Sequence, residues 1–351
     1  NLEYISSAGL RMLLKFRKKF DRNIDVINVS GEVYDILEVT GFTELLNVRK
    51  KLRNISLEGC PVIGEGALSK VYRLDHETIV KVFTHPTANL ERAEADRKTS
   101  REVFLHDIPT AIPYDVVKVG ERYGLVYEMI DADTVSAAVR KHPERLEELA
   151  LKMSRLMKKL HTTEFKPGTF PDVRDILHSM IHRPYSMGLI NADDKALVDE
   201  LIDSLPSRNT FVHFDYHPKN VMLSNDELVL IDVGDSGLGD PIVDLLASYS
   251  HFVTIPKFTA EQGLKNHEQS IGLDAKTLGA MWDVIMPDYF GTTDKSALAG
   301  YEEVINGWSL ITRIYGITVA HIPDSLRDRA AVSFMESLRK VLPDLKPIEG
   351  I

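Results

Sequence analysis

Three scarcities in this chain limit the kind of protein it can be. Among its 351 residues only Cys60 is a cysteine, which excludes an internal disulfide framework and fits a reducing compartment such as the cytoplasm. No apolar run approaches the ~20 residues that a membrane-spanning helix needs, so we expect no membrane role. Its 42 basic residues are outnumbered by 52 acidic ones, and the net charge of −10 argues against nucleic acid as the main partner.

What remains is the composition of an ordinary soluble globular protein. Hydrophobic residues make up 44% of the chain and charged residues 27%, close to the averages of folded domains. The length is sufficient for two or three domains that each bury a sizeable core.

The most informative stretch is 211–235, which reads FVHFDYHPKNVMLSNDELVLIDVGD. Asp215 is followed five residues later by Asn220, and Asp232 comes twelve residues after that. The protein-kinase pattern has a base Asp and a metal-binding Asn on one loop, followed by a second metal-binding Asp. A single Asp or Asn in a loop is usually only a turn former. Three at these spacings, with a His-Pro pair between them, indicate phosphoryl transfer.

The same stretch predicts the scaffold that would carry these residues. A short apolar strand at 211–212 leads into the loop, and two strands at 221–223 and 228–231 flank a turn at 224–226. This β-hairpin would hold Asn220 and Asp232 at one end, facing a shared metal ion.

Around these residues the chain resembles a known family. His213-Phe214-Asp215 stands where protein kinases have His-Arg-Asp, and Asp232-Val233-Gly234 stands where they have Asp-Phe-Gly. The form His-x-Asp-x-His-Pro-x-Asn is similar to the aminoglycoside phosphotransferase and choline kinase family. The run GDPIVDLL at 239–246 also resembles that family's Gly-Asp-Pro-x-x-Asp-Leu-Ala element.

The resemblance implies a role for each of these residues. Asp215 would be the catalytic base, and because an Asp has an unperturbed pKa of ~3.9 it would orient a hydroxyl and accept its proton late. Asn220 and Asp232 would hold Mg²⁺ through oxygen ligands. Asp244 would be a structural hydrogen-bond acceptor that supports the catalytic loop, while His217 would support the loop or contact a phosphate.

A glycine-rich hairpin upstream fits the nucleotide side of the same pattern. Residues 62–72 match Gly-x-Gly-x-x-Gly-x-Val, with Gly64, Gly66 and, in the third glycine's place, Ser69. Backbone N–H groups of such a loop approach the phosphates of ATP. Lys81 then interrupts an otherwise apolar strand, where a lysine needs a partner. In the pattern it reaches the α- and β-phosphates and pairs with a helix glutamate.

Two glutamates on the helix that follows compete to be that partner. Glu94 and Glu102 lie on one face, eight residues or ~12 Å apart along the axis, so they cannot both meet the lysine. We expect Glu102, because its neighbours Val103, Phe104 and Leu105 could anchor that turn in the core. Glu94 is the alternative.

A short apolar strand at 124–129 reads as the edge strand that becomes the hinge between two lobes. The kinase resemblance implies that the backbone of Glu128 and Ile130 hydrogen-bonds adenine, with Tyr127 behind it. This expectation depends on the order of the motifs along the chain.

Together these motifs predict an α+β architecture, a two-lobed protein-kinase-like fold. A small β-rich lobe would occupy 56–130 and a large helical lobe with the catalytic loop and acceptor site 131–351. The resemblance implies Mg²⁺-dependent transfer of the γ-phosphoryl group of ATP, or of GTP, to a small-molecule hydroxyl. The alternatives are a protein kinase or kinase-fold signalling protein, and a nucleotide-binding pseudo-enzyme; the intact Lys81, Asp215, Asn220 and Asp232 argue against the last.

The pattern of residues 1–48 predicts a separate α/β segment. A polar linker at 49–55 would join it to the β-rich lobe. Strands are expected at 2–5 and 24–29, and a first helix runs from Leu10 to Phe20. A second helix follows the second strand; Ser30 caps its start and Gly41 ends it.

This segment resembles the second half of a STAS domain, the fold of anti-sigma-factor antagonists. The resemblance rests on YISSAGLR at 4–11, Val29-Ser30 and LEVTGF at 37–42. Ala8 stands at the family's phosphoserine position, so we expect docking without a phosphorylation switch. A half-domain of this size needs a cover for its apolar faces. We expect upstream strands that this sequence lacks to supply the cover first, and self-association through this half second; the kinase lobe or a protein partner are further alternatives.

The segment 162–207 would flank the acceptor and is acidic. An acidic cleft would favour an acceptor that carries an amine or quaternary ammonium, whereas solvated helix faces are the simpler interpretation. His178 and His182, four residues apart, read as surface histidines, since no third metal ligand follows. The acids are Asp172, Asp175, Asp193, Asp194, Asp199 and Glu200.

Overall fold

The structure, a computed structural model, describes residues 4–20, 24–66, 68–85, 87–261, 263, 266–320 and 322–348. The chain divides into a sheet unit, Asn1–Glu94 with Tyr114–Tyr127, and a helical unit, Ala95–Pro113 with Glu128–Ile351. The predicted pairing of a β-sheet lobe with a helical lobe is confirmed. Among the described helices, none has the length and apolar content to span a membrane.

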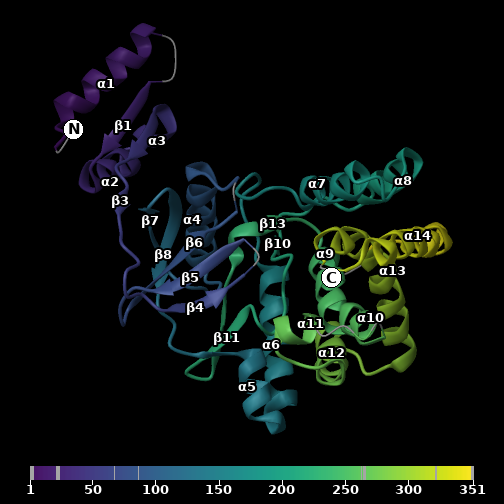
Figure 1. The fold of residues 1–351 in the computed structure, drawn as a ribbon. Helices are drawn as coiled ribbons and strands as arrows, with labels where there is room; N and C mark the ends of the chain where they lie inside the picture. The colour runs from purple at the N-terminus through teal and green to yellow at the C-terminus, as the bar shows by residue number, and fades with distance from the viewer. Residues whose placement is uncertain are drawn as a thin grey trace. The chain divides into compact units, whose positions relative to one another are not determined.

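The sheet unit begins with a small α/β layer that has its own core (Figure 1). Strands β1 and β2 pair in parallel, and Ser30 caps α2 by accepting a hydrogen bond from the Val33 N–H at 3.4 Å. Gly41 follows α2 in the left-handed region, as expected of a helix end. The elements are α1 (Ser7–Phe20), β1 (Asp25–Val29), α2 (Gly31–Val39), α3 (Phe42–Leu45) and β2 (Asn47–Lys50).

The strand predicted at 2–5 is not found at Tyr4 and Ile5, while its first two residues lie outside the described part of the chain. Ser6 explains the difference. Its hydroxyl accepts from the Gly9 N–H at 3.3 Å and its carbonyl from the Leu10 N–H at 3.0 Å. These bonds make 4–6 the entry to α1 rather than part of a ladder.

A six-stranded sheet fills the rest of this unit, in the order β3-β7-β8-β6-β5-β4. Side chains alternate between its faces. One face buries Val80, Val82, Val117 and Val126, and the other buries Phe83 and Leu125 together with Ala93 at the start of α4. The elements are β3 (Arg53–Asn54), β4 (Val62–Glu65), β5 (Ser69–Arg73), β6 (Thr78–Phe83), α4 (Leu90–Leu105), β7 (Pro113–Val119) and β8 (Arg122–Glu128).

Two expectations about this sheet need correction. The strand expected at 124–129 is β8, which lies between β7 and β6 and is therefore interior rather than an edge strand. Residues 49–55 are not simply a linker: Arg49 and Lys50 end β2, and Arg53–Asn54 pair in parallel with β7 at Val117 and Lys118.

The helical unit is built on one large apolar core that includes Tyr216, Phe252, Trp282 and Trp308. Helix α6 packs on α12, and α13 packs on α7, α9 and α14. The apolar side chains of α6, among them Leu149, Met153 and Leu160, are buried in this core. The elements are β9 (Asp133–Thr134), α5 (Val135–Lys141), α6 (Leu146–Thr162), α7 (Val173–Ser186), α8 (Ala192–Asp203), β10 (Phe211–Val212), β11 (Val221–Ser224), β12 (Glu227–Leu230), β13 (Gly237–Leu238), α9 (Ile242–Tyr249), a π-helical turn (Ser250–Thr254), α10 (Ile255–Glu261), α11 (Asn266–Ile271), α12 (Ala275–Phe290), α13 (Lys295–Val319) and α14 (Asp324–Val341).

Candidate active site

The predicted hairpin is present and connects two residues of the candidate site, Asn220 and Asp232. Strands β11 and β12 pair antiparallel from Val221 opposite Leu230 to Ser224 opposite Glu227. The two residues of the turn, at 225 and 226, both have positive φ, as a type I′ hairpin turn requires. At the open end, the Ile231 N–H donates to the Asn220 carbonyl at 2.9 Å. The chain therefore passes from Asn220 through a rigid hairpin to Asp232.

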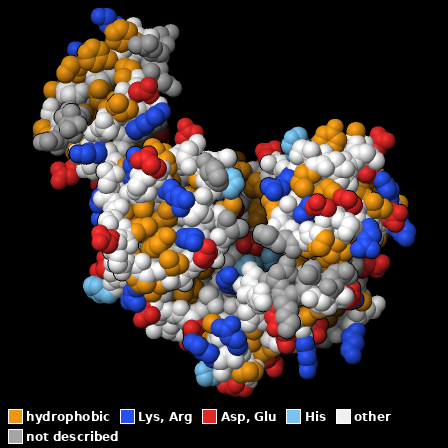
Figure 2. All heavy atoms as spheres, in the orientation of Figure 1, with side chains coloured by type: hydrophobic (Ala, Val, Ile, Leu, Met, Phe, Trp, Pro, Cys, Tyr) orange, Lys and Arg blue, Asp and Glu red, His pale blue; other side chains and the backbone are white. Residues whose placement is uncertain are grey.

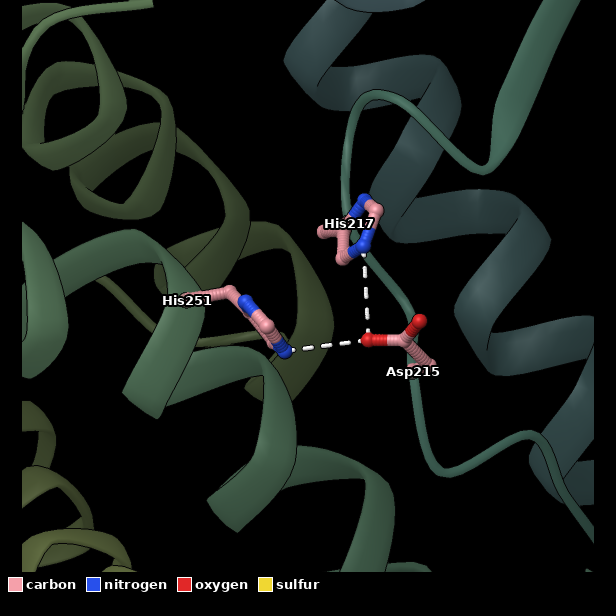
Figure 3. A group of neighbouring side chains, drawn as sticks. All are labelled: Asp215, His217 and His251. Carbon is pink, nitrogen blue, oxygen red and sulfur yellow. Dashed lines mark ion pairs between the residues drawn. The ribbon is translucent and has the colours of Figure 1, made fainter. Parts of the chain in front are cut away.

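Three side chains hold Asp215, and two of them, His217 and His251, are drawn in Figure 3. Its Oδ1 lies 3.3 Å from His217 Nε2 and 3.0 Å from His251 Nε2. Its Oδ2 accepts from the Asn220 Nδ2 amide at 2.9 Å, and the same amide donates to the Asp215 carbonyl at 3.0 Å. Half of the Asp215 side-chain surface remains exposed, so a reactant can reach a carboxylate that is already oriented.

The two histidines keep this carboxylate charged. Burial alone would raise the pKa of Asp215, but its contacts with His217 and, to a smaller extent, His251 outweigh burial and hold that pKa well below its usual value. Burial lowers the pKa of His217, with Asp215 acting in the opposite direction. His217 Nδ1 also accepts from the Lys219 N–H at 3.3 Å, so its Nε2 carries the proton that faces Asp215.

Asp244 fixes the backbone just before the base. Fully buried, it accepts hydrogen bonds from the N–H groups of His213 at 2.8 Å and Phe214 at 2.6 Å. Phe214 has a φ of 71°, a left-handed conformation that costs energy for a bulky residue and needs such support. His161 Nε2 lies 3.1 Å from the same carboxylate. Asp244 is thus the structural hydrogen-bond acceptor that the sequence indicated.

Asp96 is a buried carboxylate that the sequence reasoning missed. It is 1% exposed, accepts from the Ser100 hydroxyl at 3.3 Å, and faces the segment that follows Asp232. A Cβ added to Gly234 would lie 2.5 Å from the Asp96 carboxyl carbon, so only glycine fits there. The signal was the buried helical stripe formed by Ala93, Asp96, Ser100 and Val103.

The predicted anchoring of the helix turn at Glu102 in the core is wrong. Phe104 and Leu105, expected to anchor that turn in the core, are 41% and 58% exposed, and only Val103 is buried. The pairing of Lys81 with Glu102 or with Glu94 stays a prediction.

The predicted phosphate-binding residues lie in the sheet unit. The Gly66 N–H donates to the Ser69 carbonyl at 2.9 Å and closes the β4–β5 hairpin, whose residue 67 lies outside the described part. In β6, Lys81 is half-buried and alternates with Val80 and Val82, so it lies on the Phe83 face of the sheet. Its Nζ is 5.7 Å from the centre of the Phe83 ring.

The predicted hinge residues offer complementary backbone groups. Glu128 donates its N–H to the Ile112 carbonyl at 3.0 Å, and its carboxylate accepts from the Ile112 N–H at 2.9 Å. Ile130 uses its carbonyl to accept from the Ala132 N–H at 3.0 Å. The contact of the Glu128 and Ile130 backbone with adenine stays a prediction.

Three of the six acids in the acidic segment have partners, whereas Asp175, Asp193 and Glu200 are exposed, so a cationic acceptor stays a prediction. Asp172 caps α7 and binds Arg174 at 2.6 Å. Asp194 forms a capping box at the start of α8 and contacts Arg339. His178 is not a plain surface histidine, because it bridges Asp199 at 2.8 Å and Asp203 at 3.0 Å and so joins α7 to α8.

Acid should destabilise the protein through His267. Its Nε2 donates to the His251 carbonyl at 3.0 Å, and burial, with a smaller effect of His251, lowers the pKa of His267 to about 4. Because the unfolded pKa is ~6.5, the unfolded chain binds the extra proton first, and stability is lost as pH falls from 6.5 towards 4. Between pH 7 and 5 we expect a loss of about 2 kcal/mol from this residue.

The measurement is urea unfolding of wild type and His267→Gln at both pH values. The Gln side chain keeps an amide donor for the same carbonyl but does not titrate, so its acid sensitivity should be smaller by that amount. Equal pH dependence of the two proteins would contradict the assignment.

Comparison with known proteins gives one matching family model, the phosphotransferase enzyme family, over residues 59–274. Solved structures with similar folds include a choline/ethanolamine kinase family protein from Mesorhizobium loti, with 14% identity, covering 80% of this chain and 88% of that chain at a TM-score of 0.48. They also include an aminoglycoside-3'-phosphotransferase of type VIII, with 20% identity, 69% and 92% coverage and a TM-score of 0.46. No curated protein sequence matches.

Proposed function

This chain belongs to the phosphotransferase enzyme family, and from that premise we propose that it transfers the γ-phosphoryl group of ATP or GTP to the hydroxyl of a small molecule. The observation that carries the proposal is the bond between Asp215 Oδ2 and the Asn220 amide at 2.9 Å, at the end of the hairpin that leads to Asp232. This contact supports the proposal because Asp215 would be the base, Asn220 one metal ligand, and Asp232, next along the chain, the second.

The donor set fits Mg²⁺. The Asn220 amide nitrogen is used by Asp215, so its amide oxygen is the atom available to a cation. Asp232 contributes a carboxylate from an exposed, left-handed position that directly follows the hairpin. Mg²⁺ prefers oxygen ligands of this kind and, when bound, neutralises the charge of the phosphates.

The remaining residues would bind the nucleotide and the acceptor. Gly64, Gly66 and Ser69 would offer backbone N–H groups to the phosphates, and Lys81 would neutralise their charge. Asp215 would accept a hydrogen bond from the acceptor hydroxyl, orient it for in-line attack, and take its proton as the new P–O bond forms.

A panel of acceptors tests the function most directly. Purified protein is incubated with Mg²⁺ and ATP or GTP, together with aminoglycosides, amino alcohols such as choline, neutral polyols, and general protein substrates. We expect nucleotide-dependent phosphorylation of a small molecule. Phosphorylation of proteins alone would favour the signalling alternative, and turnover of the cationic compounds alone would support a cationic acceptor.

The N-terminal layer carries an apolar stripe that suits self-association. Met12, Phe16 and Phe20 recur every four residues on α1 and are 54%, 44% and 51% exposed, and Figure 2 shows apolar side chains gathered along this helix. An exposed apolar stripe of this kind is typical of an interaction surface. We propose that it docks on a second copy of the chain or a protein partner.

Light scattering tests this docking. The double variant Met12→Ser/Phe16→Ser should have half the mass of the wild type at equal concentration, because both positions are exposed and the change removes only surface apolar area. Val332→Ser, an equally exposed position on α14 at 58%, is the matched control and should leave the mass unchanged. A monomeric wild type would contradict self-association.

A further inference from the structure

His251 touches the proposed base from an element outside the catalytic loop. It lies in the π-helical turn Ser250–Thr254 that follows α9, and its Nε2 is 3.0 Å from Asp215 Oδ1 (Figure 3). A π-helical turn places one more residue in the turn than an α-helix does and so redirects a side chain; such turns are frequent at functional sites. No motif in the sequence marked this histidine.

The other ring nitrogen of His251 indicates why the side chain is there. Its Nδ1 is buried and has no hydrogen-bond partner within the described part of the chain. A buried polar atom without a partner costs free energy that an apolar side chain would avoid. The only polar contact described for the His251 ring is the 3.0 Å ion pair with Asp215, so the Asp215 carboxylate is what an imidazole gains at this position.

The proton of His251 can be placed from the same geometry. If Nδ1 carried the proton, a buried N–H would have no acceptor. A buried donor without an acceptor is rarer in proteins than a buried acceptor without a donor. If Nε2 carries it, the N–H points at Asp215 Oδ1 and only a lone pair is left unmatched. The neutral Nε2–H form therefore donates to the base.

Neighbouring rings hold this histidine in place. The His217 ring lies 4.7 Å away, edge to face, and the His267 ring stacks at 5.8 Å. His267 Nε2 also donates to the His251 carbonyl at 3.0 Å, which fixes the backbone of the π-helical turn. The donor is thus preorganised before any substrate binds.

We propose that His251 is a positioning residue for phosphoryl transfer: it donates Nε2–H to Asp215 Oδ1 and fixes the carboxylate so that a remaining lone pair faces the acceptor hydroxyl. This inference rests on the proposed function, in which Asp215 is the base. A carboxylate has about four lone-pair sites. His217, His251 and Asn220 take three, and the one left accepts the hydroxyl proton, while His251 keeps its own proton throughout.

The same three side chains could in principle hold a metal ion, since the ligand atoms of Asp215, His217 and His251 all lie within 4.8 Å of one another. The hydrogen bonds argue against it. A metal needs an unprotonated ring nitrogen, whereas His217 Nδ1 accepts from the Lys219 N–H and so leaves the proton on the Nε2 that faces Asp215. The cluster is better explained as two donors on one acceptor.

Three substitutions separate positioning from packing. The amide nitrogen of Gln can reach the place of a histidine Nε2, whereas that of Asn falls nearer the place of Nδ1. His251→Phe keeps a ring for the stack but has no donor. We expect His251→Phe and His251→Asn to lower kcat about 10- to 100-fold, because the base is misplaced, and His251→Gln to recover most of the loss. The KM for the nucleotide should stay unchanged in all three.

Equal losses of kcat in His251→Gln and His251→Asn would overturn the proposal, because the position of the donor would then not matter. A parallel rise in nucleotide KM, or a kcat that His251→Phe leaves intact, would overturn it as well. His267→Phe, which keeps a ring beside His251 but loses the donor to the His251 carbonyl, is the comparison and should change kcat less than any of them.

A second measurement needs no turnover, so it distinguishes failure of this inference from failure of the proposed function. Nitrogen-15 spectra of the histidine rings should show His251 as the Nε2–H tautomer, and its resonance should shift in Asp215→Ala. A protein that phosphorylates nothing but shows this coupling keeps the hydrogen bond and loses only the function. An Nδ1–H tautomer, or a His251 resonance unaffected by Asp215→Ala, would overturn the bond itself.

Discussion

Asp215→Asn should lower kcat about 10³-fold while the affinity for Mg·ATP stays within about a factor of two. An amide cannot accept the hydroxyl proton. It also presents an NH₂ group where Asp215 now receives donors from His217 and His251 on one oxygen and from Asn220 on the other. One of these contacts becomes donor against donor, so the hydroxyl loses its orientation as well as its proton acceptor.

Asp232→Ala is the matched contrast to this change. It removes a proposed metal ligand and leaves the base untouched, so Mg·ATP binding itself should weaken. Titration calorimetry with Mg·ATP measures binding in both variants, and steady-state kinetics with the best acceptor measures kcat. Unchanged Mg·ATP affinity in Asp232→Ala would remove the metal assignment, and a kcat near wild type in Asp215→Asn would remove the base.

The catalytic loop could be predicted from sequence because its determinants are local. The hairpin follows from alternating apolar residues and a turn at 225–226 that tolerates positive φ, and it alone fixes the spacing between Asn220 and Asp232. The support from Asp244 came from a family resemblance, and the buried carboxylate does accept the two backbone N–H groups.

His251 and Asp96 could not be found in the same way. Each reaches the loop from another element, and neither belongs to a motif with fixed spacing. His251 depends on a π-helical turn, which no local pattern announces. Asp96 looks like one acid among several on a charged helix until its burial is known. The positions of both residues depend on contacts between elements that are far apart in the sequence. The same is true of β8, whose neighbours β6 and β7 make it an interior strand.

The acidic segment shows the same limit for charge. Six acids within 172–200 suggested an open negative cleft, but formal charge does not reveal where a carboxylate points. Asp172 is the N-cap of α7, Asp194 completes the capping box of α8 with Asn191, and Asp199 pairs with Lys195 and His178. Helix N-termini attract acids for their own stability, so a count of acids does not show how many of them face an acceptor.

Asp244→Ala should cost about 3–5 kcal/mol of unfolding free energy, the second large effect we expect. The carboxylate is fully buried and accepts from two backbone N–H groups and from His161. Without it, both N–H groups stay buried with no acceptor. Phe214 also loses the contact that maintains its positive φ, so the loop before Asp215 should relax and kcat should fall with stability.

Urea unfolding of Asp244→Ala, Asp244→Asn and Asp226→Ala measures this contribution. Asp226 also pairs with cations, Arg145 and Lys152 at 2.7 Å each, but it is 67% exposed, so loss of these ion pairs should cost little beyond the strain of an alanine at its positive φ. Asn can still accept through its amide oxygen and should fall between the two. A loss in Asp244→Ala no larger than that in Asp226→Ala would show that the loop is held by something other than this carboxylate.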